Sequence, residues 1–195
     1  RGAGNLLEDE QSGHVAAVGF ELYCQMLEDA AEELRAGVTE GEAEPREPVR
    51  VEVDVDAYVP ADYIPFEAAK IDVHRRVAAA REPGELRELR EELEDRFGEP
   101  PQPVTNPIDL HRARITLGDA GARSVEFRAG RLRVAPVELD SSQVEALRER
   151  LPEVIYEWRE QTVVLPVPDE PGARLGAVTA LADGLGAARA LPAAA

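Results

Sequence analysis

The chain has 195 residues with 39 acidic and 22 basic side chains, which gives a formal net charge of −17. This charge repels a phosphate backbone and therefore argues against direct binding of DNA or of an anionic membrane by this chain. Hydrophobic residues make up 44%, which is typical of a globular domain, and the single cysteine, Cys24, excludes an intramolecular disulfide and favours a reducing, cytoplasmic environment.

The first quarter predicts a polar segment, a helix and a linker. Apolar residues recur at spacings of three and four from Val15 to Leu34, which predicts a helix over 15–36 that Gly37 ends. Glycine, prolines and several glutamates then indicate a linker. The N-terminus shows neither an initiator methionine nor a signal peptide, so we expect further residues upstream. The expected units are a segment over 1–37, a linker over 38–48 and a domain over 49–195.

The middle of the chain predicts a strand, a shaped loop and three helices. Apolar and polar residues alternate in the strand, and two prolines shape the loop. The third helix is expected to begin at the pair Asn106-Pro107, because asparagine caps helices and proline suits their first turn. In chain order these elements cover 49–55, 59–65, 66–80, 86–97 and 106 to about 121.

The last third predicts two strand pairs and two helices. Ala129-Gly130 is expected to close the first hairpin, and prolines follow the second strand pair. The predicted fold class is α+β, with an N-terminal helical segment and then a domain whose central helices pack on short antiparallel strand pairs. The expected late elements are a hairpin over 125–134, a helix around 144–151, strands at 154–156 and 162–165, and a helix over 173–190.

The sequence lacks the motifs of an independent enzyme. It has no phosphate-binding loop, no nucleophile elbow and no zinc-binding H-E-x-x-H, so we expect no catalytic residue, cofactor or metal in this chain. Gly184-Leu185-Gly186 lacks the third glycine and the preceding strand of a dinucleotide motif. Carboxylates crowd residues 91–95, but they fall on the outer side of a helix whose inner side is a leucine row, which indicates a solvated face.

Two groups of residues are candidates for a protein interface. Four arginines crowd the predicted hairpin, and guanidinium groups suit carboxylates and phosphates, although an ordinary polar sheet face is the commoner explanation. Tyr63 and Ile64 lie between two prolines in a stiff loop and are candidate anchors, with core packing as the alternative. The four arginines are Arg123, Arg128, Arg131 and Arg133.

Residues 1–14 contain glycines that permit tight turns and an Arg and a Gln that can converge if the chain folds back. The pattern R-G-A-G-x-L-L-x-x-x-Q-S-G-H, followed by V-G-F-E-L-Y, resembles the translocation motif shared by the bacterial transcription-repair coupling factor family (Mfd) and the RecG helicases. The motif positions are Arg1, Gly2, Gly4, Gln11, Ser12 and Gly13.

The continuation favours the coupling factors. V-D-A-Y-V-P-A-D-Y-I-P, the later L-x-x-L-R-E-E-L-E-D-R-F-G-E-P-P and V-E-L-D-S-S-Q are similar to the C-terminal domain of that family, which RecG lacks. The resemblance covers nearly the whole chain. One departure is Glu8, where the family usually has glycine.

The resemblance implies a parent protein that is an ATP-driven translocase on double-stranded DNA. Such a parent displaces stalled RNA polymerase and recruits the UvrA component of nucleotide excision repair, with ATP and Mg bound by motor domains upstream. It also implies that Arg1 and Gln11 couple ATP hydrolysis to movement. The C-terminal domain is expected to contact the UvrB-like N-terminal module of the same protein, masking UvrA binding.

Three functional hypotheses follow. The first is a regulatory interaction domain joined to the end of a translocation motif. The second gives the main role to residues 1–37 as a force-coupling element of the motor. The third is a protein-interaction adaptor of unrelated function.

Overall fold

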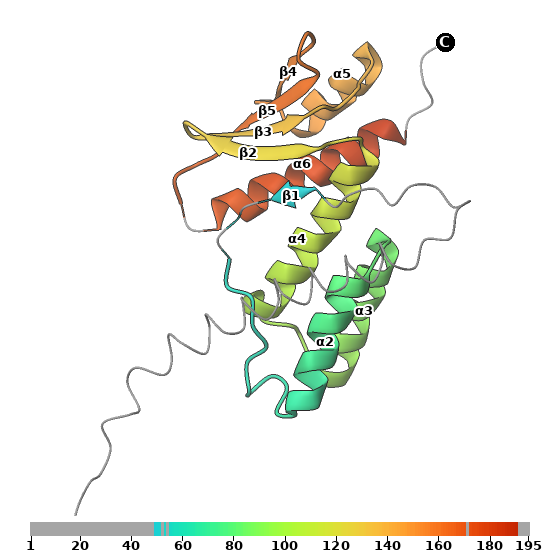
Figure 1. Cartoon of the computed structure of the whole chain (residues 1–195), viewed down its shortest axis with the longest axis vertical. Helices are drawn as coiled ribbons and strands as arrows, with labels where there is room; N and C mark the ends of the chain where they lie inside the picture. The colour runs from blue at the N-terminus through green and yellow to red at the C-terminus, as the bar shows by residue number, and fades with distance from the viewer. Residues whose placement is uncertain (1–48, 52, 54, 171, 191–195) are drawn as a thin grey trace, which may run out of the picture.

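A computed structural model describes residues 49–51, 53, 55–170 and 172–190, which hold five helices and five strands (Figure 1). The predicted helix over 15–36, the translocation motif and the boundaries at 37 and 48 lie outside these residues. In chain order the elements are β1 (Arg50–Val51), α2 (Glu67–Ala79), α3 (Pro83–Phe97), α4 (Gln102–Asp119), β2 (Ser124–Arg128), β3 (Arg131–Ala135), α5 (Ser141–Arg150), β4 (Ile155–Glu157), β5 (Thr162–Pro166) and α6 (Ala173–Arg189).

All five strands form one sheet in the order β1-β2-β3-β5-β4. The hairpins β2–β3 and β4–β5 are antiparallel, as predicted, and the first is closed by Ala129 and Gly130, whose φ angles of 50° and 68° match the right-handed twist of the flanking strands. The α+β prediction is confirmed. Two strand pairings were not predicted. β3 pairs with β5, for example through Leu132 and Leu165, and β1 runs parallel to β2. The predicted strand pairs are therefore parts of one mixed sheet.

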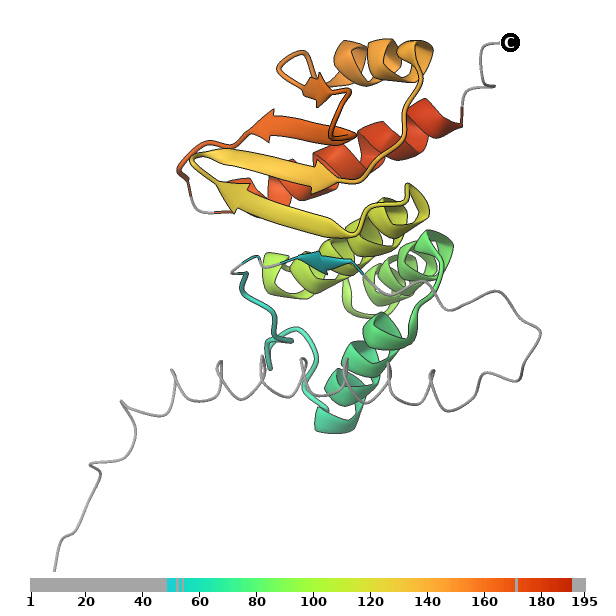
Figure 2. The ribbon, with the colours of Figure 1, turned by 45° about the horizontal axis from the view of Figure 1, so that its top comes forward.

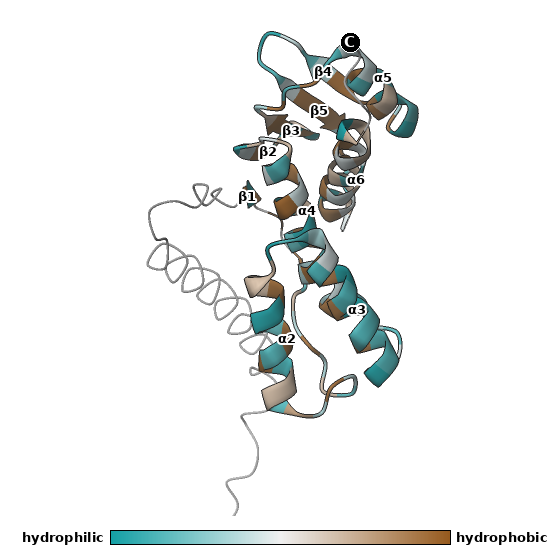
Figure 3. Ribbon diagram, turned by 90° about the vertical axis from the view of Figure 1, so that its right-hand side faces the viewer, coloured by the Kyte–Doolittle hydropathy of each residue, from teal (hydrophilic) through white to brown (hydrophobic). Residues whose placement is uncertain are grey.

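The hydrophobic core has two parts that α4 connects. One part lies between the sheet and helices α4, α5 and α6, and the other lies between α2, α3 and the loop before α2. Val104 and Ile108 of α4 belong to the second part, whereas Ala113 and Leu117 belong to the first. Figure 2 shows α6 along one face of the sheet, and Figure 3 shows the hydrophilic outer side of α3. The central helices α2 and α3 thus pack on α4 rather than on the strands.

Helix α4 begins four residues earlier than the sequence pattern indicated. Its N-terminal residue is Gln102, its N-cap is Pro101, and Pro103 lies in the first turn, where a missing N–H is tolerated. The prediction that Asn106 caps this helix is therefore wrong. Pro101 and Pro103 define the start of the helix instead.

The residues Asn106 and Pro107 instead join α4 to the loop before α2. Pro107 has no N–H to donate to the carbonyl of Pro103, one turn earlier in the helix. The backbone N–H of Tyr58 donates to that carbonyl at 3.2 Å. The Asn106 side-chain amide donates to the carbonyl of Asp56 at 3.0 Å. A helix-breaking residue thus supplies a docking point for the neighbouring loop.

The glycines of the weak dinucleotide pattern lie inside α6, where they allow close helix packing. A Cβ atom on Gly184 would lie 2.8 Å from Cδ1 of Leu147 on α5. A Cβ atom on Gly186 would lie 3.3 Å from Cγ2 of Thr116 on α4. These distances explain the two glycines without a nucleotide.

Alanine at Gly184 and at Gly176 is expected to change stability in opposite directions. Gly176 has no atom within 4 Å of an added Cβ, so Gly176→Ala should raise the free energy of unfolding by up to about 1 kcal/mol through helix propensity. At Gly184 the added methyl meets the fully buried Leu147. Overpacking of this kind costs about 1–3 kcal/mol, which exceeds the propensity gain. Urea titration of both variants of the chain measures the difference, and equal stabilisation by both would contradict the packing assigned to Gly184.

Candidate docking surfaces

The loop before α2 is folded by its own backbone and one tyrosine. The backbone N–H groups of Tyr63 and Ile64 both donate to the carbonyl of Pro60, at 3.2 and 3.0 Å. The Tyr63 hydroxyl lies within hydrogen-bond distance of the carbonyl oxygens of Leu93 (3.1 Å) and Gly98 (3.0 Å), at the C-terminal end of α3. The loop is therefore attached to α3 at a defined place.

The two candidate anchors in this loop have different environments. Ile64 has 0% exposed surface and packs in the core between α2 and α3, so its assignment to an interface is wrong: its side chain is already buried within the chain. Tyr63 is half-buried, and its ring meets that of Phe97 edge to face, with centroids 5.8 Å apart. Only Tyr63 remains available at the surface.

Three charged residues form an ion triad across α2 and α3. The Glu92 carboxylate lies 2.7 Å from the guanidinium of Arg76 and 2.6 Å from that of Arg96. Hydrogen bonds from these two groups lower the pKa of Glu92 to about 2, and the bond to Glu92 raises the pKa of Arg76. The guanidinium of Arg96 also lies 5.0 Å from the centre of the Phe97 ring. We call Tyr63, Arg76, Glu92, Arg96 and Phe97 the α2–α3 edge.

Sequence reasoning had assigned Glu92 to an ordinary solvated face. The spacing of Glu92 and Arg96 is that of a helical i,i+4 pair, which the sequence shows. The contribution of Arg76 depends on how α2 crosses α3, and no local pattern reports that crossing. The sequence therefore predicts the pair Glu92–Arg96 but not the contact of Glu92 with Arg76.

The four hairpin arginines do not form one patch. Arg133 lies in the middle of β3 and pairs with Glu157 (2.7 Å) and Glu160 (3.1 Å). Arg123 precedes β2 at one end of the hairpin, while Arg128 and Arg131 face each other at the turn. Arg123 and Arg128 are therefore roughly 17 Å apart along the strand. The prediction of a single arginine surface is thus wrong, and only the turn end holds two of the four together.

His111 of α4 is a buried histidine that contacts the end of α2. Its side chain is 7% exposed, and its Nε2 lies 3.0 Å from the carbonyl oxygen of Ala80 at the end of α2. A carbonyl accepts, so Nε2 carries the proton and donates. Burial lowers the pKa of His111, and the nearby Arg114 lowers it further, while the hydrogen bond to Ala80 and the Glu85 carboxylate act in the opposite direction.

The lowered pKa of His111 predicts a loss of stability in mild acid. The unfolded chain takes up a proton at this residue near its ordinary pKa of about 6.5, while the folded chain binds it only at lower pH. The free energy of unfolding should therefore fall as pH drops below that value. Urea titrations at neutral and mildly acidic pH should show a larger fall for the unaltered chain than for His111→Gln, which cannot titrate. Equal falls would contradict the assignment.

The described residues contain no helix that is both long and apolar enough to cross a membrane. They also contain no cluster of three or more His, Cys, Asp or Glu side chains placed to hold a metal ion.

Comparison with known proteins identifies the family. The model of the TRCF domain matches residues 53–147. The transcription-repair-coupling factor of Mycobacterium bovis is 36% identical over 180 residues, which cover 88% of this chain and 15% of that protein. The protein of the same name from Staphylococcus haemolyticus is 37% identical over 135 residues, covering 69% of this chain and 11% of that protein.

A solved structure has the same fold. The crystal structure of the C-terminal domain of transcription-repair coupling factor superposes with a TM-score of 0.55 at 19% identity, covering 71% of this chain and 91% of that one. The chain spans about 15% of the length of the Mycobacterium relative. On the domain match, the curated relatives and the fold together, this chain belongs to the transcription-repair-coupling factor family and carries its TRCF domain.

Proposed function

We propose that residues 49–195 form a regulatory domain of an ATP-dependent DNA translocase that displaces stalled RNA polymerase and recruits nucleotide excision repair. The domain contacts the UvrB-like N-terminal module of the same protein, masks its UvrA-binding surface and restrains the ATPase. ATP hydrolysis, with its Mg ion, and contact with double-stranded DNA belong to motor domains of the parent. The relatives are named transcription-repair-coupling factors, and this name supports a role in a protein that links transcription to DNA repair.

The observation that carries the proposal is the α2–α3 edge. Charged side chains that are already fixed lose little conformational entropy when a partner docks. Glu92 is held in place by two guanidinium groups. Arg96 lies against Phe97, which in turn contacts Tyr63. Arginine and tyrosine are enriched among residues that dominate interface energetics.

The overall charge indicates what kind of partner surface fits. A chain with a net charge of −17 associates fastest with a positively charged surface, and the association weakens as salt screens the charges. Direct contact with DNA phosphates is disfavoured by the same charge. A protein module with a net positive charge is therefore the expected partner.

Removing the domain tests the proposal in the parent protein. A parent that lacks residues 49–195 should hydrolyse ATP faster than the intact protein and should bind UvrA more tightly, because the masking contact is gone. The DNA-stimulated ATPase of the deletion variant serves as a control for an intact motor. Unchanged ATPase and unchanged UvrA binding would rule out autoinhibition by this domain.

A second role concerns residues 1–37. The match to the Mycobacterium relative covers 88% of this chain, which is more than residues 38–195 contain. The similarity to the coupling factors therefore includes part of this N-terminal segment. We propose that Arg1 and Gln11, with Gly2, Gly4, Ser12 and Gly13, couple ATP hydrolysis to movement of the parent along DNA. Arg1→Ala or Gln11→Ala in the parent should abolish displacement of RNA polymerase while ATP hydrolysis continues. Normal displacement by both variants would exclude this role.

A further inference from the structure

One end of the sheet holds three exposed arginines without acidic partners. They are Arg128 and Arg131 at the β2–β3 turn and Arg174 at the start of α6. Within the described residues, no carboxylate lies within salt-bridge distance of any of the three, whereas Arg133 in the same hairpin has two such partners. The N–H donors of these three guanidinium groups are therefore available to an anionic ligand.

The positions of these arginines are unfavourable in the absence of an anion. Arg128 and Arg131 are directly opposite each other in the antiparallel register, where like charges repel. Arg174 occupies the first turn of α6, the positive end of the helix dipole, and α6 has neither an acidic residue in that turn nor a side-chain cap. An anion bound among the three groups relieves both repulsions.

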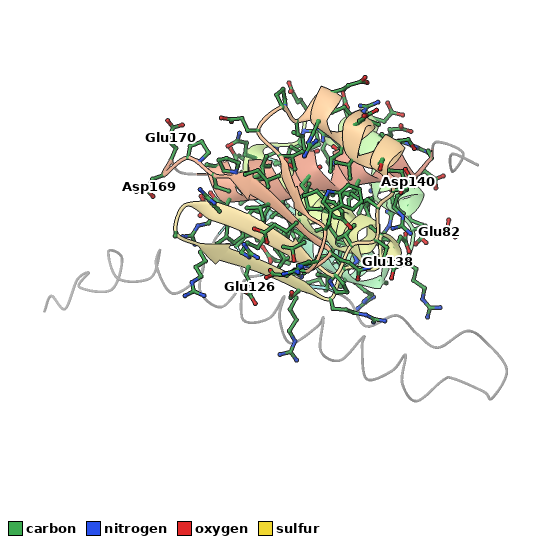
Figure 4. All side chains as sticks on the ribbon, turned by 90° about the horizontal axis from the view of Figure 1, so that it is seen from above. Glu82, Glu126, Glu138, Asp140, Asp169 and Glu170 are labelled. Atoms are coloured by element: carbon green, nitrogen blue, oxygen red, sulfur yellow. The ribbon has the colours of Figure 1, made fainter. Side chains whose placement is uncertain are left out.

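The three side chains surround a hollow of about 280 Å³. Arg174 is held at its rim, with its guanidinium 5.3 Å from the centre of the Phe127 ring. The loop that follows β5 is fixed to the hairpin turn, because the Val167 N–H donates to the carbonyl of Gly130 at 2.9 Å. Asp169 also lines the hollow. Figure 4 shows Asp169 and the neighbouring Glu170 at this end of the sheet, directed outward.

We propose that this hollow binds the carboxylate side chains of an acidic peptide segment. Guanidinium groups bind carboxylates through paired hydrogen bonds, which gives geometric specificity as well as attraction. A DNA duplex fits less well, because it needs a long track of cations, whereas this hollow offers three guanidinium groups at one point. The hollow lies beside the sheet, away from the α2–α3 edge, so the proposal is independent of the proposed function.

The test measures binding of a fluorescent oligoglutamate peptide to the 195-residue chain by anisotropy at low salt. We expect saturable binding that Arg128→Ala/Arg131→Ala weakens about tenfold or more, as expected for loss of two charge-assisted contacts. The matched control is Arg148→Ala/Arg150→Ala on α5, which removes the same charge from exposed positions and should leave the affinity within about twofold.

Two further variants keep the test decisive if the double variant is poorly folded. Arg174→Ala leaves the hairpin intact and should also weaken binding, while Asp169→Asn removes a competing carboxylate and should strengthen it. Absence of saturable binding, or equal loss in the α5 control, overturns the proposal. Hairpin-dependent binding of a short DNA duplex that is tighter than that of the peptide also overturns it and indicates a nucleic-acid site.

Discussion

Replacing Ile64 by alanine is expected to lower the free energy of unfolding by about 2–5 kcal/mol, the range observed when buried Ile or Leu is truncated. Ile64 has no exposed surface and packs with the apolar residues of α2, α3 and α4. The truncation removes apolar contacts and leaves a cavity that a loop bounded by Pro60 and Pro65 cannot close easily. Urea titration of the chain, followed by circular dichroism, measures the loss.

Phe66 provides the matched control two residues away. Its ring is 68% exposed, and its side chain does not cap α2. Phe66→Ala should therefore change the free energy of unfolding by less than about 0.5 kcal/mol. If Ile64→Ala were as mild as Phe66→Ala, Ile64 would not be a core residue.

Replacing Glu92 by glutamine in the parent protein is expected to raise both ATPase activity and UvrA binding. Glutamine keeps the shape of the side chain but removes the charge that holds Arg76 and Arg96. The two guanidinium groups would then have to be immobilised on docking, which costs about 0.5–1.5 kcal/mol for each side chain. The docked state should therefore be populated far less. The same change should cost the isolated fold about 1 kcal/mol or less, because the triad is partly exposed.

The control for this variant is Glu88→Gln. Glu88 lies one turn earlier on α3, is exposed and has no ion-pair partner among the described residues, so the change removes the same charge without disturbing the triad. It should leave ATPase activity and UvrA binding unaltered. Equal responses to both substitutions would show that net charge, and not the α2–α3 edge, controls docking.

Much of the fold was predictable because its signals are local. The β2–β3 hairpin followed from alternating residues around Ala129-Gly130, and α6 followed from its apolar spacing. The start of α4 was not predictable in the same way, because several Pro residues compete as first-turn signals and tertiary bonds to Tyr58 and Asp56 decide how Asn106-Pro107 is used. The parallel pairing of β1 with β2 joins residues far apart in sequence and leaves no local pattern.

The candidate surfaces were predictable only where one element carries the signal. The pair Glu92–Arg96 lies on one helix, but the third member, Arg76, comes from another. Proline spacing located the loop that holds Tyr63 and Ile64, yet it does not tell which of two adjacent side chains faces inward. The hairpin arginines were visible as a cluster in sequence, whereas the pairing of Arg133 with Glu157 requires the β4–β5 register.

Direct titration of the 195-residue chain into the isolated UvrB-like module tests the central claim most directly. Calorimetry at moderate salt should show saturable binding with one partner per chain. Glu92→Gln should weaken that binding about tenfold, because Arg76 and Arg96 would then have to be immobilised on docking, while Glu88→Gln should not. A regulatory contact through the α2–α3 edge would be contradicted if no saturable binding were found. It would also be contradicted if Glu92→Gln left the affinity unchanged.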